Sequence, residues 1–327
     1  MKTILLHNVY DEMNRDNVIF RLDSDYNRDD CLQHLSYLKE ILEGQGYHLQ
    51  TIDQGDVMTC DYLLFFDMPS FISSLGQSYF LQYMKKESFK KKMLLFLWEP
   101  PVVNEQNWKS EYHPFFHTIF TWYDDIVDNH KFVKIHYAQP DKRYPCTTFS
   151  ERKFCTMING NRSSTHPLEL YSERRIAIHF FESHHPEDFD LFGVAWDPLE
   201  FPSYKGAIKE KGDILSRYKF AICFENMGRV NGYITEKIFD CFRAGCVPVY
   251  LGAFNITDYV PEGAFIDFRK FNDYEQLYTF LKQITEEQYQ AYLEQINQYL
   301  KSSLYMERFS KEAFAKTVVD RIMILDR

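Results

Sequence analysis

Short apolar runs alternate with amphipathic stretches along the first half of the chain. Runs of this length are typical of strands buried on both faces, and the stretches between them have the apolar spacing of surface helices. Five strands are predicted, at Lys2–His7, Tyr47–Ile52, Tyr62–Phe66, Met93–Trp98 and Thr118–Trp122. Two helices are predicted, at Leu32–Leu42, ended by a left-handed residue near Gly44, and around Tyr79–Phe89. The alternation predicts a parallel α/β sheet.

The same alternation restarts after residue 150. Strands are predicted at Phe154–Ile158, Phe189–Val194, Phe220–Phe224, Val247–Leu251 and Phe265–Phe268, and helices at Leu168–Phe181 and from Glu236. From Asp273 the apolar spacing is helical, and this tail is expected to cover the second domain or to reach back to the first. Because 327 residues exceed what one hydrophobic core usually holds, we expect two α/β domains, 1–150 and 151–327.

Composition and charge narrow the range of functions. A formal net charge of -10 argues against a nucleic-acid partner, because such binders carry a basic surface. No apolar run has the length of a signal peptide or a bilayer span, so we expect a cytoplasmic protein without an integral membrane segment. The seven cysteines include no Cys-x-x-Cys pair, and Pro114 separates His113 from His117, so we expect reduced thiols and no bound metal.

The segment 218–252 carries the candidate chemistry. No Walker-type loop and no Gly-x-Gly-x-x-Gly run follows a predicted strand, so a nucleotide must be bound in another way. Thr235 is placed to cap a helix that ends near Gly245, and Lys237 falls in its first turn, where the helix dipole and an ammonium suit a diphosphate. Glu236 suits the hydroxyl groups of a neutral sugar or ribose. The alternative for an isolated Thr-Glu-Lys is a solvated surface helix.

Glu225 and Asn226 end the strand before this helix, at the carboxyl edge of the sheet where open α/β folds bind ligands. The whole segment reads Phe-Ala-Ile-Cys-Phe-Glu-Asn, a short loop, Tyr-Ile-Thr-Glu-Lys, then Val-Pro-Val and Gly. It resembles the α-1,3-fucosyltransferase family of bacterial type (glycosyltransferase family 10), with Ile234 where valine is usual. The resemblance runs through residues 154–271, includes the Asp-Leu-Phe-Gly sequence at 190–193, and is weak in the first domain.

The resemblance implies GDP-fucose as the donor and two facing Rossmann-like domains of the GT-B type with a helical C-terminal tail. It implies donor contacts from four residues, Asn226, Tyr233, Glu236 and Lys237. Glu225 and Thr235 are further donor-binding candidates. Arg229 and Asn231 lie in a loop that varies within the family, and their roles stay open.

Arg174 interrupts an apolar stripe on the helix predicted from Leu168, so its side chain is predicted to point inward. A buried guanidinium needs a partner, and an ion pair with a buried carboxylate fits as well as an anion-binding role. The resemblance favours contact with the donor phosphate. Arg175 is the alternative if the helical register differs.

Inverting transfer of a sugar needs a base that takes the proton of the acceptor hydroxyl. Glu99 follows a predicted strand of the first domain, and the prolines after it stop the strand, so we predict Glu99 as the base in an interdomain cleft. An ordinary polar strand end is the alternative role, and Asp124 and Asp125 are rival bases. With Lys237 and Arg174 on the leaving diphosphate, no metal or other cofactor is required.

Three aromatic residues at strand ends are candidates for an acceptor-stacking face, although packing is the commoner role: Trp98, Trp122 and Tyr123. The resemblance implies transfer to the 3-hydroxyl of N-acetylglucosamine, or glucose, in a glycan such as N-acetyllactosamine. It further implies Lewis x-type products in bacterial lipopolysaccharide and, at most, peripheral contact with the inner membrane. Two alternatives stay open: a GT-B transferase that uses another nucleotide sugar, and a non-catalytic nucleotide- or glycan-binding protein.

Overall fold

The computed structural model describes residues 1–69, 93–145 and 147–326, and the helix predicted around Tyr79–Phe89 lies outside them. The chain divides into two compact units. The first comprises Met1–Pro140 with Glu307–Arg327, and the second comprises Asp141–Met306. This division falls before the predicted boundary at residue 150 and assigns the end of the helical tail to the first unit.

The first unit is built on a six-stranded sheet in the order β2-β1-β3-β4-β5-β6, in which neighbouring strands are parallel. Its strands are β1 (Lys2–Asn8), β2 (Tyr47–Thr51), β3 (Tyr62–Phe66), β4 (Met93–Leu97), β5 (Thr118–Thr121) and β6 (Phe132–Lys134). The five predicted strands are confirmed. The sequence analysis missed β6 because three half-buried residues carry too little periodic signal.

Alternate residues of each strand enter cores on opposite faces of this sheet. Ile4 and Leu6 of β1 join one core, and Leu5 between them joins the other. The same division holds along β3 and β4, whose residues are buried throughout. A strand buried on both faces needs no polar alternation, and this explains its uninterrupted apolar run.

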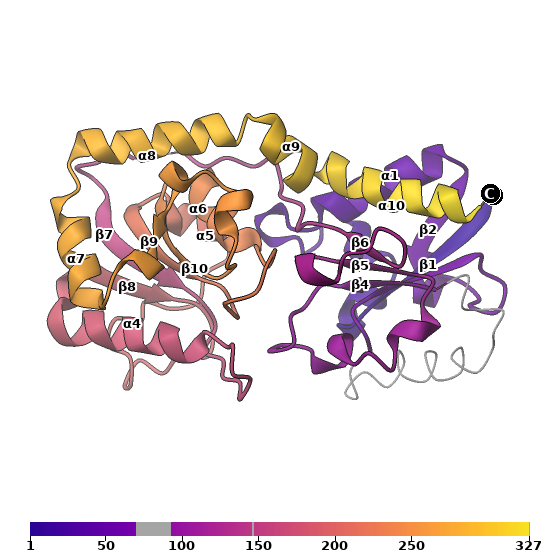
Figure 1. Cartoon of the computed structure of the whole chain (residues 1–327), viewed down its shortest axis with the longest axis horizontal. Helices are drawn as coiled ribbons and strands as arrows, with labels where there is room; N and C mark the ends of the chain where they lie inside the picture. The colour runs from indigo at the N-terminus through magenta and orange to yellow at the C-terminus, as the bar shows by residue number, and fades with distance from the viewer. Residues whose placement is uncertain (70–92, 146, 327) are drawn as a thin grey trace. The chain divides into compact units, whose positions relative to one another are not determined.

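Two helices distant in sequence lie side by side on one face of the first sheet, as Figure 1 shows: α1 (Gln33–Gly44) and α10 (Lys311–Leu325). Phe314 and Val318 of α10 enter the same core as Leu38 of α1. The tail therefore reaches back to the first unit because α10 buries its apolar side there. The left-handed residue after α1 is Gly46, with φ of 85°, and not Gly44, the last residue of the helix.

The residue after α10 is tied to the edge of the same sheet. Asp326 forms an ion pair with Lys2 at 2.5 Å and accepts hydrogen bonds from the hydroxyls of Tyr47 and Tyr62. These contacts join the end of the chain to β1, β2 and β3.

The second unit has a five-stranded parallel sheet in the order β11-β10-β9-β7-β8. Its strands are β7 (Lys153–Ile158), β8 (Phe189–Phe192), β9 (Tyr218–Phe224), β10 (Val247–Leu251) and β11 (Ile266–Asp267). Its helices before the tail are α4 (Tyr171–His184), α5 (Lys211–Leu215) and α6 (Glu236–Arg243). The predicted elements are confirmed, although α4 begins later than predicted, β11 is shorter, and α5 was not predicted.

The tail begins in the second unit with α7 (Tyr274–Gln283) and α8 (Glu286–Tyr299), and α9 (Ser303–Phe309) precedes α10. Leu277 and Tyr289 enter the core of the second unit, and the Tyr289 hydroxyl donates a hydrogen bond to the Gly245 carbonyl at 2.8 Å. The first part of the tail therefore covers the second unit, as expected.

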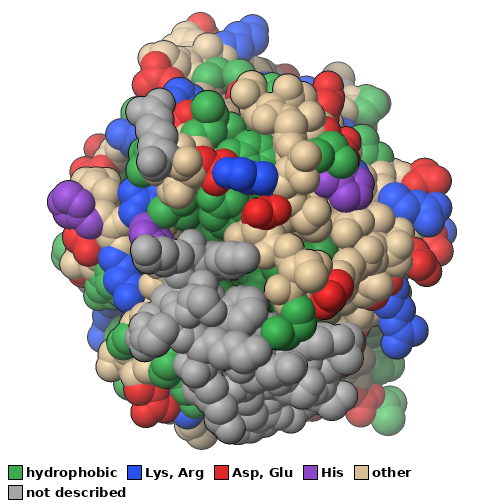
Figure 2. Space-filling view, turned by 90° about the vertical axis from the view of Figure 1, so that its right-hand side faces the viewer, with side chains coloured by type: hydrophobic (Ala, Val, Ile, Leu, Met, Phe, Trp, Pro, Cys, Tyr) green, Lys and Arg blue, Asp and Glu red, His purple; other side chains and the backbone are tan. Residues whose placement is uncertain are grey.

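Charged side chains of both signs are interspersed on the face of the molecule that Figure 2 shows, and the described residues form no block of one sign there. Within the described ranges, every helix is too short or too polar to cross a membrane.

Candidate functional site

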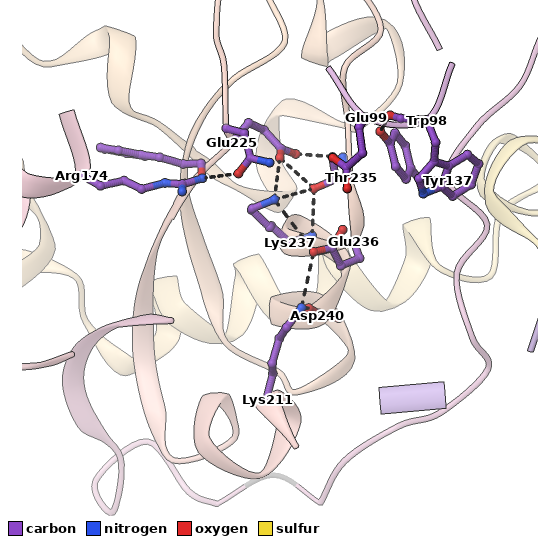
Figure 3. A network of polar contacts seen from close by, with 12 residues as sticks. Trp98, Glu99, Tyr137, Arg174, Lys211, Glu225, Thr235, Glu236, Lys237 and Asp240 are labelled. Atoms are coloured by element: carbon purple, nitrogen blue, oxygen red, sulfur yellow. Dashed lines mark hydrogen bonds and ion pairs between the residues drawn. The ribbon is translucent and has the colours of Figure 1, made fainter. Parts of the chain in front are cut away.

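The carboxyl end of β9 delivers a fully buried carboxylate to the edge of the second sheet. Glu225, which follows Phe224, has no exposed surface. Its Oε1 accepts a hydrogen bond from the Thr235 backbone N–H at 2.8 Å, and its Oε2 accepts from the Thr235 hydroxyl at 2.7 Å and from the Lys237 ammonium at 3.2 Å (Figure 3). Glu225 therefore joins the end of β9 to the start of α6, and its contacts give it a positioning role.

Thr235 is the predicted cap of α6. Its hydroxyl oxygen accepts from the backbone N–H of Lys237 at 3.5 Å and from the Lys237 ammonium at 3.1 Å. The apolar side of the helix is buried as predicted, and Gly245, with φ of 62°, follows its end. The close packing here also requires Gly252, because a Cβ there would lie 2.5 Å from Glu225 Cγ.

Glu236 lies between two ammonium groups, with an oxygen 3.9 Å from Lys237 Nζ and 3.4 Å from Lys211 Nζ. Partial burial opposes ionisation of Glu236, but the charges of Lys237 and Lys211 outweigh it and hold its pKa well below the usual range. Burial likewise opposes the charge of Lys237, and Glu236 and Glu225 outweigh it and raise the pKa. The 44% exposed Glu236 side chain is therefore an ionised acceptor for hydroxyl groups.

Lys211 comes from α5, an element that the sequence analysis did not predict. Its ammonium also contacts Asp240 of α6 at 2.8 Å, and Asp240 pairs with Arg243 at 2.5 Å (Figure 3 shows the Lys211 contact). No local pattern marks Lys211 as a site residue, because its position depends on how α5 packs on α6.

Arg174 points inward from α4, as predicted, and is only 3% exposed. Its Nε and Nη2 donate to the Phe224 carbonyl at 3.2 and 2.6 Å, and Nη2 donates to Asn226 Oδ1 at 3.0 Å. The partner is thus a strand-end carbonyl and an amide, where the sequence analysis considered a buried carboxylate. Burial lowers the pKa of Arg174 from its ordinary value. Arg175 instead donates to Asn161 at 2.7 Å.

The other residues of the loop before α6 differ in exposure. Tyr233 is only 1% exposed, and its backbone carbonyl accepts a hydrogen bond from Tyr250 at 3.4 Å. Arg229 is exposed and has a left-handed backbone with φ of 62°. Its backbone N–H donates to the Gly252 carbonyl at 3.2 Å. The backbone of the loop is therefore held against the end of β10.

In the first unit, Glu99 follows β4, and its carboxylate accepts a hydrogen bond from the Tyr10 hydroxyl at 3.2 Å. Its carbonyl accepts from Asn107 at 3.0 Å and from the Trp108 indole at 3.1 Å. A second carboxylate, that of Asp67 at the end of β3, contacts the backbone of Glu99. The sequence analysis missed Asp67, although its place directly after a buried strand is the same signal that pointed to Glu99.

The three candidate acceptor-stacking residues have different surroundings. Trp98 is partly buried and packs against Tyr137, with ring centroids 4.3 Å apart (Figure 3). Trp122 is only 2% exposed and donates its indole N–H to the Trp98 carbonyl at 3.1 Å. Its burial favours the packing role over the role of an acceptor-stacking face, and the sequence analysis left both open. Tyr123 is partly exposed.

The rival base Asp124 pairs with Lys134 at 2.5 Å, and Asp125 is exposed. Across the described residues, no three His, Cys, Asp or Glu side chains gather as metal ligands. The six cysteines of that part of the chain form no disulfide with one another.

Comparison with known proteins relates part of the chain to a family. Residues 171–318 match the model of glycosyltransferase family 10 (fucosyltransferase), C-terminal part. This matched segment resembles a glycosyltransferase family 10 domain. The segment includes α4, the strand-end residues Glu225 and Asn226, and the start of α6.

Short stretches of the chain also resemble two curated fucosyltransferases. The chain is 38% identical over 73 residues to an α-(1,4)-fucosyltransferase of Arabidopsis thaliana. This alignment covers 22% of this chain and 18% of the relative. It is 34% identical over 76 residues to the α-(1,3)-fucosyltransferase FucT of Helicobacter pylori. This alignment covers 23% of this chain and 16% of the relative. The chain thus matches less than a fifth of the length of these relatives.

Two solved α1,3-fucosyltransferase structures, one without a named ligand and one with GDP-fucose, match with TM-scores of 0.60 and 0.55. The alignments cover 100% of this chain and 90% of each structure, at 17% and 16% identity. The chain therefore has a GT-B type fold of two α/β units with C-terminal helices, as predicted.

Proposed function

We propose that this protein is an inverting fucosyltransferase. It transfers L-fucose from GDP-fucose to the 3-hydroxyl of N-acetylglucosamine, or glucose, in a glycan acceptor such as N-acetyllactosamine, and makes Lewis x-type products. The observation that carries the proposal is the family 10 segment in which Glu225, Thr235 and Lys237 form one hydrogen-bonded cluster at the start of α6.

The second unit is proposed to bind the donor. The N–H groups at the start of α6 and the Lys237 ammonium suit the diphosphate, because a helix start attracts anions. Arg174 Nη1 makes no hydrogen bond within the described part of the chain, so it is available for a phosphate oxygen. The ionised Glu236 accepts hydrogen bonds from hydroxyl groups of fucose or ribose. Asn226 and Tyr233 complete the donor site that the resemblance implies.

The first unit is proposed to bind the acceptor and to supply the base. Glu99 takes the proton of the acceptor hydroxyl. At the same time the acceptor oxygen forms a bond to fucose C1, and the bond from C1 to the GDP oxygen breaks. One in-line displacement inverts the anomeric centre. The leaving GDP carries the negative charge, which Lys237 and Arg174 stabilise without a metal or another cofactor. Trp98 and Tyr123 offer aromatic surface to the acceptor.

A donor panel with product analysis tests the proposed reaction. We expect fucose from GDP-fucose on the 3-hydroxyl of N-acetylglucosamine when N-acetyllactosamine is the acceptor, identified by linkage analysis. GDP-mannose and uridine diphosphate sugars are expected to react far more slowly. Equal rates with another nucleotide sugar would favour the alternative GT-B transferase, and tight binding without turnover would favour a non-catalytic binding protein.

Substitutions at two positions separate proton transfer from donor binding. Glu99→Gln should retain GDP affinity and lose kcat by about 100-fold or more, which is the usual contribution of a general base. Lys237→Ala should weaken GDP binding as well as turnover. Asp124→Asn is the matched control among the first-unit carboxylates. A Glu99→Gln enzyme with normal kcat and an Asp124→Asn enzyme without activity would transfer the role to Asp124.

For the biological setting, we propose a cytoplasmic bacterial enzyme of lipopolysaccharide synthesis with peripheral contact with the inner membrane. The resemblance to bacterial members of the family supports this setting. Fractionation of cells that express the full chain tests it, and recovery of the protein outside the cytoplasm and the inner membrane would contradict it.

A further inference from the structure

Two carboxylates leave neighbouring strands at the same edge of the first sheet. β3 and β4 are parallel partners in which Phe66 lies opposite Phe96, and Asp67 donates its backbone N–H to the Phe96 carbonyl at 3.0 Å. Asp67 is only 2% exposed. Because parallel strands end at a common edge, the Asp67 carboxylate is delivered to the turn that contains Glu99.

Asp67 holds the backbone of that turn directly. A single oxygen, Oδ1, accepts hydrogen bonds from the N–H groups of Trp98 at 2.7 Å and Glu99 at 2.9 Å and from the Asn107 side chain at 2.5 Å. The N–H of Glu99 is therefore fixed by a buried acceptor.

The carbonyl of Glu99 is fixed from the other side. Asn107, which has no exposed surface, donates to this carbonyl at 3.0 Å and accepts a hydrogen bond from the Met68 N–H at 2.7 Å. Asp67 and Asn107 also bond each other, so both ends of the Glu99 residue are tied to the end of β3.

A purely structural clamp would not need a charge here. Burial and then the charge of Glu99 raise the pKa of Asp67 to about 7. The charge of Glu99 acts on Asp67, and the Tyr10 hydroxyl donates a hydrogen bond to the Glu99 carboxylate. An uncharged amide could accept the same hydrogen bonds without the cost of placing a second carboxylate beside Glu99.

We propose that Asp67 is a positioning residue for Glu99: it fixes the backbone of Glu99, and when Asp67 is ionised its negative charge makes the neighbouring Glu99 carboxylate a stronger proton acceptor. The inference rests on the proposed role of Glu99 as the base. The inference adds Asp67, the residue that follows β3, to Glu99, which the sequence analysis placed after β4.

The test compares Asp67→Asn with Asp61→Asn in the full chain. Asp67 has a left-handed backbone with φ of 67°, which asparagine also tolerates, so the substitution removes the charge and keeps the shape. Asp61 is the matched control, because it precedes the same strand at its opposite end and accepts from the Thr3 N–H at 2.8 Å. The measured quantities are kcat, the KM for GDP-fucose, and kcat/KM as a function of pH.

We expect Asp67→Asn to lower kcat by about 100-fold, the usual cost of a misplaced reacting group, with little change in the KM for GDP-fucose. The acid limb of its pH profile should move to lower pH, because a neutral amide no longer favours the protonated form of the pair. A purely structural role would lower activity without moving the limb. Wild-type kcat and an unmoved acid limb in Asp67→Asn would overturn the inference.

A second variant keeps the test decisive if Asp67→Asn unfolds. Asn107→Ala leaves the Asp67 charge in place and removes the tie to the Glu99 carbonyl. It should lower kcat, and the acid limb should not move to lower pH, because the lost hydrogen bond from Asn107 favours the ionised form of Asp67. A shift to lower pH equal to that of Asp67→Asn would contradict the role of the Asp67 charge. If wild-type protein shows no fucosyl transfer, the proposed function fails. An inactive Glu99→Gln beside a normal Asp67→Asn rejects this inference alone.

Discussion

The carboxylate of Glu225, fully buried at the end of β9, lies 3.2 Å from the ammonium of Lys237 in the first turn of α6. A buried carboxylate is stable only when its oxygens have partners, and here Thr235 supplies the remaining hydrogen bonds. The cluster therefore sets the direction of the Lys237 side chain before any ligand binds, which reduces the ordering cost of binding an anion.

Glu225→Gln should destabilise the second unit by about 3 kcal/mol, because it leaves the Lys237 ammonium, whose side chain is 19% exposed, facing a neutral amide in place of a buried carboxylate. The measurement is chemical denaturation followed by fluorescence. Glu236→Gln is the matched control on the same lysine, and its 44% exposed side chain predicts a loss below about 1 kcal/mol. Equal stability losses in the two variants would contradict the structural role of Glu225.

Arg174→Met should cost about 3 kcal/mol of stability, because it leaves the Phe224 carbonyl and the Asn226 amide oxygen without their buried donor. Arg175→Met is the control, since its partner Asn161 is accessible to water, and we expect a loss below about 1 kcal/mol. Calorimetric titration with GDP on both variants then shows which arginine contacts phosphate. Weaker GDP binding in Arg175→Met alone would assign the phosphate to Arg175.

Gly252→Ala should destabilise the second unit by about 2 kcal/mol, because the added Cβ would lie 2.5 Å from both Glu225 Cγ and the Tyr250 hydroxyl. Gly44→Ala is the control, since a Cβ there meets nothing within 4 Å and alanine favours the helix. Thermal unfolding of the two variants tests the difference. A Gly252→Ala protein as stable as wild type would show that the end of β10 moves easily.

Asp326→Asn should loosen α10 from the first unit, because it removes the ion pair with Lys2 and weakens the contacts with Tyr47 and Tyr62. Limited proteolysis should release the C-terminal helix faster, and the exposed Asp320→Asn is the control. Burial opposes ionisation of Asp326, but the hydrogen bonds from Lys2, Tyr47 and Tyr62 outweigh it and lower its pKa below 3.8. The contribution of Asp326 is therefore complete above pH 3.8 and is lost as pH falls through the folded pKa. Protection of α10 that is unchanged at lower pH would contradict this role.

Local patterns in the sequence were enough to determine the cap of α6, the inward direction of Arg174 and every strand of the described residues except β6. Uninterrupted apolar runs such as that of β4 can be stable only inside a covered sheet, and a threonine before Glu-Lys is a local helix signal. These features depend on residues that are close in sequence, so short segments are sufficient to predict them.

Only the tertiary structure decided which distant groups meet. Four contacts join segments that are far apart along the chain. They are the hydrogen bond of Arg174 to a strand-end carbonyl, the contact of Lys211 with Glu236, the packing of α10 on the first sheet, and the placement of Asp67 beside Glu99. Such contacts depend on strand order and on how whole helices pack, and hydrophobic periodicity carries no information about either.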